Sequence, residues 1–214
     1  MNLDLLQYGN PWRGNLPGVA APGLPSGFPE LDAMLPDGGW PRGALTELLV
    51  SNEGVGALQL LLPALARLSQ QRRWIAWVAP PYVPYRPALV AAGVDVSRLL
   101  FIHPRAGDDG LSTVEQSLRS GTCGAVLAWP MAGDGATLRR LQLAAAEGDA
   151  RGVLFRPARL AEQPSPAILR LRIEQAENGL DLSLIKRRGG WAAGPVSLSM
   201  DRLLVAAGTA RALC

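Results

Sequence analysis

The residues with the clearest chemical meaning lie in a glycine-containing turn that follows a short apolar segment at 45–50. A P-loop, the turn with which many proteins hold the phosphates of ATP, reads G-x-x-x-x-G-K-[ST]. In that frame the second glycine is present at Gly56, and Ser51 stands at the first. Ala57 and Leu58 replace the lysine and the hydroxyl residue. The candidate residues of this degenerate P-loop are Ser51, Glu53, Gly54, Gly56, Ala57 and Leu58.

These replacements remove the chemistry of ATP hydrolysis. The P-loop lysine neutralises the β- and γ-phosphates and the hydroxyl holds Mg²⁺, and Ala57 and Leu58 can do neither. The sole lysine of the chain, Lys186, lies far along the sequence. The backbone amides of the turn could still attract an anion weakly. We therefore predict no catalytic residue, no metal site and no cofactor, and the alternative for the motif is a glycine-rich turn without function.

The segments around this turn alternate between apolar runs and helical stretches. Such alternation predicts an α/β fold, with a mostly parallel central sheet flanked by helices. The expected strands are 45–50, 74–79, 99–103, 125–129 and 152–155. The expected helices are 55–70, 86–92, 111–120 and 136–147. Pro63 should kink the first helix or shift its start.

The pattern changes after about residue 165. Segments 168–173 and 180–185 predict two strands joined around Asn178-Gly179, a strong hairpin signal, so the sheet should end in an antiparallel hairpin. Segment 196–200 predicts a further strand, and 201–213 a short helix or a tail. The expected organisation has three parts. These are a proline- and glycine-rich irregular segment at 1–43, an α/β core at 44–186 and a C-terminal extension at 187–214.

Bulk composition excludes several classes of protein. The net charge is +3 and the isoelectric point is about 9.3, and this charge is too weak to predict nucleic-acid binding by itself. The two cysteines, Cys123 and Cys214, have neither disulfide nor metal-ligand spacing. The first residues do not read as a signal peptide, and the longest apolar stretch, 57–68, is too short to span a bilayer. We expect a soluble cytoplasmic protein.

The flanks of the turn resemble RecA in one collinear order. Segments 26–32 (SGFPELD) and 38–43 (GGWPRG) resemble the approach to the first core strand of that family, and Gly93-Val94-Asp95 resembles a stretch before a later strand. The resemblance covers about residues 26–175 and implies a RecA-like core. It also implies a lost ATP site. Pro81 stands where RecA has its catalytic glutamate, and Trp129-Pro130 stand where its Walker B strand helps to hold Mg²⁺.

Further motifs narrow the resemblance. Trp12-Arg13-Gly14, segment 78–85 (VAPPYVPY) and segment 123–130 (CGAVLAWP) resemble the ImuA family, the RecA- and SulA-related accessory proteins of bacterial damage-induced mutagenesis. The resemblance implies a non-catalytic adaptor of translesion DNA synthesis in the SOS response. It implies binding to ImuB, an inactive Y-family polymerase homologue, and to RecA. An error-prone DnaE-type polymerase would be an indirect partner.

Three other functions stay open. A SulA-like inhibitor of cell division, which would bind FtsZ, shares the degenerate core, but such proteins are generally shorter, and the extended tail favours ImuA. The second is a regulator that binds nucleotide without hydrolysing it. The third is a direct DNA-binding module. The sequence does not indicate an oligomeric state.

Three sets of residues are candidates for binding surfaces. Tyr82 and Tyr85 lie in a proline-aromatic loop that would either bind a partner or pack on the fold, and tyrosine is enriched at interfaces. Leu203 and Leu204 lie on the apolar face of the C-terminal stretch, which would fit a groove on ImuB or pack on its own domain. A basic set would contact DNA phosphates weakly or form a solvated surface. Its members are Arg139, Arg140, Lys186, Arg187 and Arg188.

Overall fold

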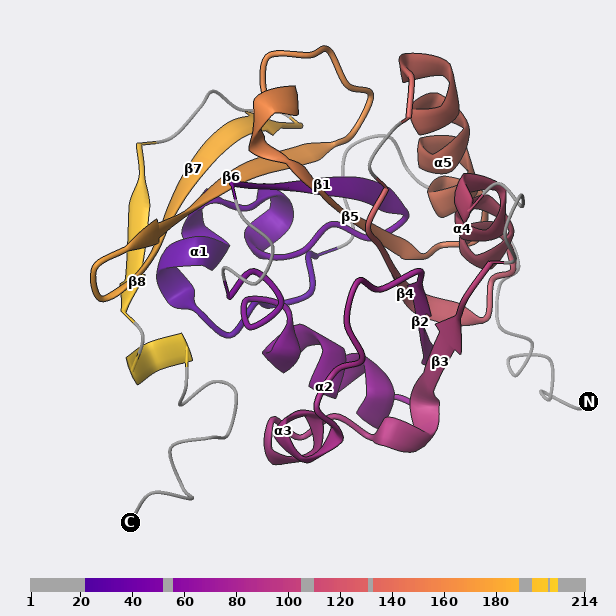
Figure 1. Ribbon diagram of the computed structural model, residues 1–214, viewed down its shortest axis with the longest axis horizontal. Coiled ribbons are helices and arrows are strands. Elements are labelled where there is room, and N and C mark those ends of the chain that lie inside the picture. Colours follow the sequence, from indigo (N-terminus) through magenta and orange to yellow (C-terminus); the bar gives the residue numbers. More distant parts are fainter. Residues whose placement is uncertain are drawn as a thin grey trace, which may run out of the picture.

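The structure is a computed structural model that describes residues 22–51, 56–104, 110–130, 133–188, 194–199 and 201–203. Its strands form one sheet. They are β1 (Ala44–Val50), β2 (Trp74–Val78), β3 (Leu99–Ile102), β4 (Cys123–Ala128), β5 (Arg151–Pro157), β6 (Leu169–Ala176), β7 (Gly179–Arg187) and β8 (Val196–Ser199). Their order across the eight-stranded sheet is β3-β2-β4-β5-β1-β6-β7-β8 (Figure 1).

The strand pairing divides the sheet into two parts. From β3 to β6 each strand pairs in parallel with its neighbours. β6 and β7 form an antiparallel hairpin, and β8 adds to it antiparallel. The protein is therefore a mixed α/β protein, and the predicted terminal hairpin is confirmed. Its likeness to RecA stays a prediction.

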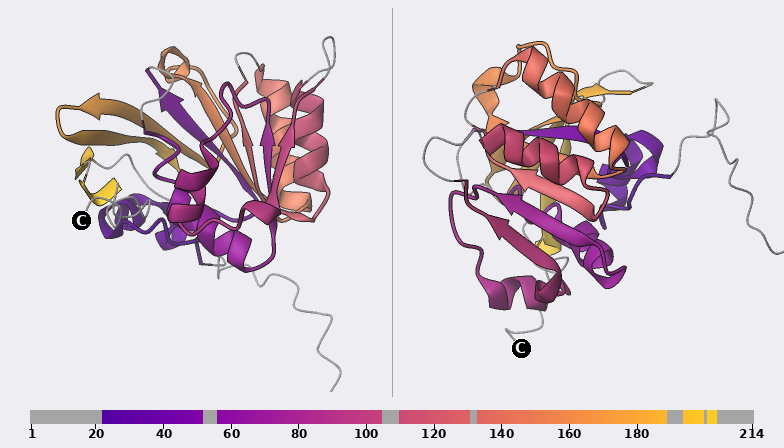
Figure 2. Two further views of the ribbon diagram at one scale, coloured as in Figure 1. Left: turned by 60° about the horizontal axis from the view of Figure 1, so that its bottom comes forward. Right: turned by 90° about the vertical axis from the view of Figure 1, so that its right-hand side faces the viewer.

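Helices cover both faces of the sheet (Figure 2). They are α1 (Pro29–Met34), α2 (Leu62–Gln70), α3 (Arg86–Ala91), α4 (Gly110–Arg119) and α5 (Gly135–Glu147), with 3₁₀ turns η1 (Pro36–Gly38), η2 (Val96–Arg98) and η3 (Ala158–Leu160). Buried residues of α1, α2 and α3 belong to one apolar cluster with one face of the sheet, and those of α4 and α5 to a second cluster on the other. None of the helices in the described ranges has the length and hydropathy that crossing a membrane requires.

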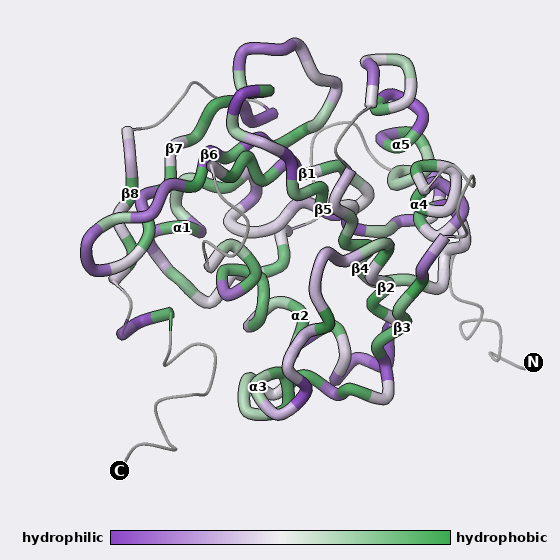
Figure 3. The backbone as a smooth tube through the Cα atoms, viewed as in Figure 1, coloured by the Kyte–Doolittle hydropathy of each residue, from purple (hydrophilic) through white to green (hydrophobic). Residues whose placement is uncertain are grey.

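The central strands are hydrophobic on both faces because helices lie on both. Every residue of β4 is buried, as are all but the last of β1, whereas β7 alternates between buried and half-buried positions along most of its length. Figure 3 shows the hydrophobic colour concentrated in the strands and the hydrophilic colour at the turn between β6 and β7. The predicted strands match β1 to β7 closely. For the central strands, burial on two faces gives short uninterrupted apolar runs.

Two segments differ from the predicted elements. The helix expected at 55–70 begins at Leu62, since Pro63 occupies its first turn, so the prediction that Pro63 shifts the start is confirmed. Irregular structure was the prediction for 1–43, and it is wrong for α1, whose Leu31 is fully buried in the core. α1 has only six residues and begins at Pro29, which is too short to produce a clear helical period.

A charged contact between α4 and α5 should make the stability of the protein sensitive to acid. Glu115 accepts hydrogen bonds from Arg140, and these lower the pKa of Glu115 below the ordinary 4.5. Burial raises that pKa, and a hydrogen bond of 2.9 Å from Arg119 lowers it further. A lowered pKa means that the stabilisation is present above pH 4.5 and is lost as the pH falls through the folded-state value. Glu115→Gln should cost about 1 kcal/mol at neutral pH.

Urea unfolding of the wild type and of Glu115→Gln between neutral and acidic pH tests this prediction. The difference between their free energies of unfolding should shrink below pH 4.5. A difference that stays constant over that range would contradict it.

Candidate partner-binding surface

The described residues of the turn after β1, which are Ser51 and residues 56–58, lack the lysine and the Mg²⁺-binding hydroxyl of a P-loop at positions 57 and 58. Gly56 has a φ of 60°, which a non-glycine residue adopts with strain. The next residues form successive tight turns, with the amide of Gln59 donating to the carbonyl of Gly56 at 2.8 Å. Ala57 is buried, Leu58 packs against the core, and Ser51 is exposed. Glu53 and Gly54 lie outside the described residues.

Aromatic packing fills the carboxyl end of β4, where an ATPase would hold Mg²⁺. Trp129 stacks on Phe155 at a ring-centroid distance of 4.6 Å and an interplanar angle of 3°, and lies 5.7 Å from Trp77. Pro130 is half-buried and Pro81 is exposed. These groups have no acid, base or metal-ligand chemistry.

We expect millimolar Mg-ATP to leave the melting temperature of the protein unchanged, since a ligand stabilises only in proportion to its binding. Ala57 and Leu58 supply no charge clamp, and helix α2 does not begin until Leu62. Thermal unfolding with and without Mg-ATP checks this. A melting temperature that rises with nucleotide concentration would revive the nucleotide-binding alternative.

Exposed apolar side chains gather in one stretch of the described chain. All exposed large apolar residues of the described chain, except Leu143, fall in the stretch from the first residue of β2 to β3. We call this set the edge surface; its members are Trp74, Tyr82, Val83, Tyr85, Val90, Leu100 and Phe101. β3 forms one edge of the sheet (Figure 1), and α3 contacts η2, the turn that leads into β3. Tyr82 is 67% exposed, Val83 84% and Tyr85 74%. Partner binding by these tyrosines stays a prediction.

The fold holds the loop of the edge surface from both ends. At one end Ala79 adopts a left-handed φ of 49°, and its amide donates to the carbonyl of Ile102 on β3 at 2.9 Å. At the other end the buried Leu89 anchors α3 to the core. A non-glycine residue at positive φ is strained, and such strain persists where the surrounding structure fixes it. The backbone of the loop is thus positioned by the core while its side chains face outward.

The base of the edge surface carries a cationic side chain on an aromatic ring. The guanidinium of Arg98 lies 5.4 Å from the ring centroid of Trp74, a favourable cation–π geometry. The side chain of Asp95 accepts a hydrogen bond from the amide of Ser97 at 2.9 Å. Hydrogen bonds from the side chain and the amide of Ser97 lower the pKa of Asp95. An arginine therefore lies against one aromatic member of the edge surface, and both residue types are enriched in protein interfaces.

The other predicted surface residues are placed separately. Leu203 is fully buried in the core, and its neighbour Arg202 pairs with Glu30; Leu204 lies outside the described residues. Leu203 is therefore packed on its own domain here. Among the basic set, Arg139 and Arg140 lie on α5 and the others at the end of β7.

Several of these basic groups already have protein partners. Arg140 pairs with Glu115, Lys186 donates to the carbonyl of Ser165 at 2.6 Å, and Arg187 donates to the carbonyl of Met34 at 3.1 Å. Arg139 and Arg188 are exposed. DNA contact by this set stays a prediction.

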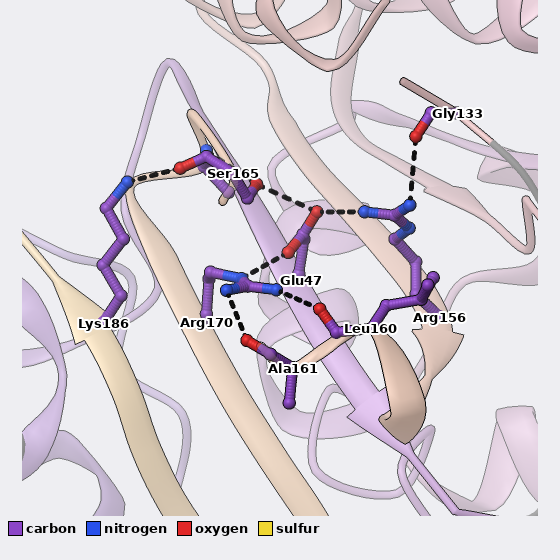
Figure 4. Close-up of polar contacts among 9 residues, drawn as sticks. Glu47, Gly133, Arg156, Leu160, Ala161, Ser165, Arg170 and Lys186 are labelled. Atoms are coloured by element: carbon purple, nitrogen blue, oxygen red, sulfur yellow. Dashed lines mark hydrogen bonds and ion pairs between the residues drawn. The ribbon is translucent and has the colours of Figure 1, made fainter. Parts of the chain in front are cut away.

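A buried charged cluster was missed by the sequence prediction (Figure 4). Glu47, at the centre of β1, is fully buried; its Oε1 accepts from Nη1 of Arg156 at 2.7 Å, and its Oε2 accepts from Nε of Arg170 at 2.6 Å. Ser165 donates to Oε1 at 3.0 Å. Both arginines are buried. The one signal in the sequence was a glutamate inside an apolar strand, because a buried charge needs a partner.

The arginines of this cluster also fix the connection between β5 and β6. Nη1 and Nη2 of Arg170 donate to the carbonyls of Ala161 and Leu160, both at 2.9 Å. Nη2 of Arg156 donates to the carbonyl of Gly133 at 3.2 Å. The cluster is therefore structural, joining three strands and two connections.

The fold and the edge surface together define a mixed α/β protein that displays aromatic side chains at one edge of its sheet. A family model described as "Cell division inhibitor SulA" matches residues 43–152. That span is just over half of the chain and runs from the start of β1 to the start of β5. The chain belongs to this SulA family.

Curated relatives agree with the family model. The protein named "Cell division inhibitor SulA" from Edwardsiella piscicida is 36% identical over 113 residues, which are 50% of this chain and 67% of that protein. The protein of that name from Klebsiella aerogenes is 30% identical over 135 residues, 61% of this chain and 79% of that protein. The one from Photorhabdus laumondii is 29% identical over 109 residues, 51% of this chain and 62% of that protein.

These comparisons correct the expected function. The prediction of an ImuA-type adaptor of translesion synthesis is wrong, because the family model and the relatives carry the name of a division inhibitor. Segments 78–85 and 123–130, which supported ImuA, lie inside the matched span and are part of a SulA-related core. The tail that favoured ImuA supplies β8 and the buried Leu203 to this domain. Contacts with ImuB, RecA or a DnaE-type polymerase stay untested predictions.

Proposed function

We propose that this protein is a non-catalytic inhibitor of cell division that acts by binding FtsZ through the edge surface. The observation that carries the proposal is that the edge surface lies wholly within residues 43–152, the span matched to the division-inhibitor family. Its most exposed aromatic side chains, Tyr82 and Tyr85, are of a residue type that is enriched in protein-binding sites. The relatives of known name support the choice of a division protein as partner.

Binding, rather than catalysis, is the mode of action that the replaced residues support. Ala57 and Leu58 stand at the phosphate-clamp and Mg²⁺ positions, and Trp129 packs where a metal ligand would lie. We infer that the core is a RecA-like core that has kept its sheet and lost its nucleotide site. The parallel pairing from β3 to β6 and the P-loop frame after β1 support that inference.

The experiment that tests the proposal mixes the purified full chain with FtsZ from the same organism and measures FtsZ assembly by sedimentation. The proposal expects a complex and a dose-dependent loss of sedimenting FtsZ, together with filamentous cells on overexpression. Normal assembly at excess inhibitor and cells of normal length would overturn it. Co-purification with ImuB is the matched comparison, and a stable complex with ImuB but none with FtsZ would also overturn the proposal.

A further inference from the structure

Three arginines converge at the amino-terminal ends of the strands, away from the edge surface and from the turn after β1. Arg42 precedes β1, Arg73 precedes β2, and Arg151 is the first residue of β5. The strands β2, β4, β5 and β1 are consecutive in the sheet. Arg151 aligns with Ala44 on one side and with Ala125 on the other.

These three guanidiniums share one nearby carboxylate. Nε of Arg42 donates to Oδ1 of Asp149 at 2.6 Å, and this contact lowers the pKa of Asp149. Nη2 of Arg73 donates to the carbonyls of Gly121 and Cys123, at 3.2 and 3.0 Å, which are neutral acceptors. Because Asp149 pairs with Arg42, neither Arg73 nor Arg151 forms an ion pair with a carboxylate among the described residues.

Arg151 is the least satisfied of the three. Its Nε is buried and has no hydrogen-bond partner among the described residues. Burial lowers its pKa to about 10, the charges of Arg42 and Arg73 act in the same direction, and Asp149 opposes them. A partly buried charge without a counter-ion is costly, and an anion beside the guanidinium would offset that cost.

We propose that Arg73 and Arg151 form an oxyanion site that takes a phosphate group, with the Arg42–Asp149 pair at its border. Two guanidiniums match the double negative charge of a phosphate, and guanidinium N–H groups donate charge-assisted hydrogen bonds to its oxygens. A single carboxylate would balance only one of the two charges. The site differs from the degenerate P-loop, which lies after the carboxyl end of β1, and it does not rest on the proposed function.

Calorimetric titration of the full chain with inorganic phosphate, with chloride at equal ionic strength as the blank, tests the site. Arg151→Met, which keeps an apolar stem, should weaken phosphate binding at least about tenfold. Arg139→Gln removes one positive charge from the exposed face of α5 and should change the affinity less than about twofold.

Asp149→Asn should change the affinity for phosphate in the direction opposite to Arg151→Met. It removes the competing carboxylate at a residue with φ 52°, a conformation that asparagine tolerates, so phosphate should bind several-fold more tightly. This variant keeps the proposal falsifiable if Arg151→Met does not fold. Looser binding by Asp149→Asn would overturn the site.

Comparison with AMP separates two sources of the phosphate group. Equal binding of AMP and inorganic phosphate indicates that the site reads the phosphate alone, and tighter binding of AMP indicates a phosphomonoester ligand; both support the site. Three results would overturn it. These are no phosphate binding above the chloride blank, an equal loss in Arg139→Gln, and binding confined to single-stranded DNA.

Discussion

Glu47→Gln should lower the free energy of unfolding by about 3–5 kcal/mol, a large part of the stability of a domain of this size. The substitution keeps the size of the side chain but removes its charge. Arg156 and Arg170 would then be two buried guanidiniums without a counter-ion, at 3% and 4% exposure. Equilibrium unfolding in urea, followed by circular dichroism, measures the effect.

Two further variants separate the charge effect from general damage. Glu115→Gln removes a carboxylate whose arginine partners are about half exposed, and should cost far less than Glu47→Gln. A triple replacement of Glu47, Arg156 and Arg170 by methionine should recover much of the loss, because removing a whole buried ion cluster is often nearly neutral. A loss below about 1 kcal/mol in Glu47→Gln would show that the cluster contributes little.

The same substitution should loosen the connection between β5 and β6. The guanidinium of Arg170 donates hydrogen bonds to the carbonyls of Leu160 and Ala161, and Glu47 orients that guanidinium by accepting from its Nε. Arg159 is exposed in this connection and offers a tryptic site. Cleavage after Arg159 should therefore be faster in Glu47→Gln than in Glu115→Gln under native conditions.

Under the proposed function, Val83→Ser combined with Tyr85→Ser should weaken binding to FtsZ about 30-fold or more, which corresponds to about 2 kcal/mol. Both side chains are largely exposed, at 84% and 74%, so their loss removes apolar contact area without opening a cavity. Affinity measured by surface plasmon resonance or by titration of FtsZ assembly checks the effect. The free energy of unfolding should change by less than about 0.5 kcal/mol.

Leu143→Ser is the matched control for this double variant. Leu143 is 55% exposed, but it lies on α5, outside the edge surface. It should leave FtsZ binding unchanged. If Leu143→Ser weakens binding as much as the double variant, or if the double variant binds like the wild type, the edge surface is not the contact site.

The order of strands and helices could be predicted because the central strands give apolar runs and a turn signal marks the hairpin. The central strands β1 and β4 are covered on both sides and give unbroken apolar runs, and Asn178-Gly179 marks the hairpin after β6. The start of α2 could be placed only as a shift caused by Pro63. α1 could not be predicted, because its stability comes from packing Leu31 and Met34 on the sheet rather than from local propensity.

The replaced P-loop residues could be predicted from the sequence, whereas the exposure of the candidate binding residues could not. The missing lysine and hydroxyl are local facts of sequence, visible at Ala57 and Leu58. The exposure of Tyr85 and the burial of Leu203 depend on contacts between distant segments. The pairing of Glu47 with Arg156 and Arg170 joins residues more than one hundred positions apart, and no spacing rule connects them.

The partners of Glu47 have a consequence for genetic screens. The glutamate lies inside the span shared with the family, whereas Arg156 and Arg170 lie beyond it. β6, which covers one side of β1, also lies outside. Under the proposed function, substitutions selected only for lost inhibition of cell division would therefore fall in β6, β7 and the buried Glu47 cluster as readily as in the edge surface. The abundance of each variant protein has to be measured together with its phenotype before the substituted residue is assigned to partner binding.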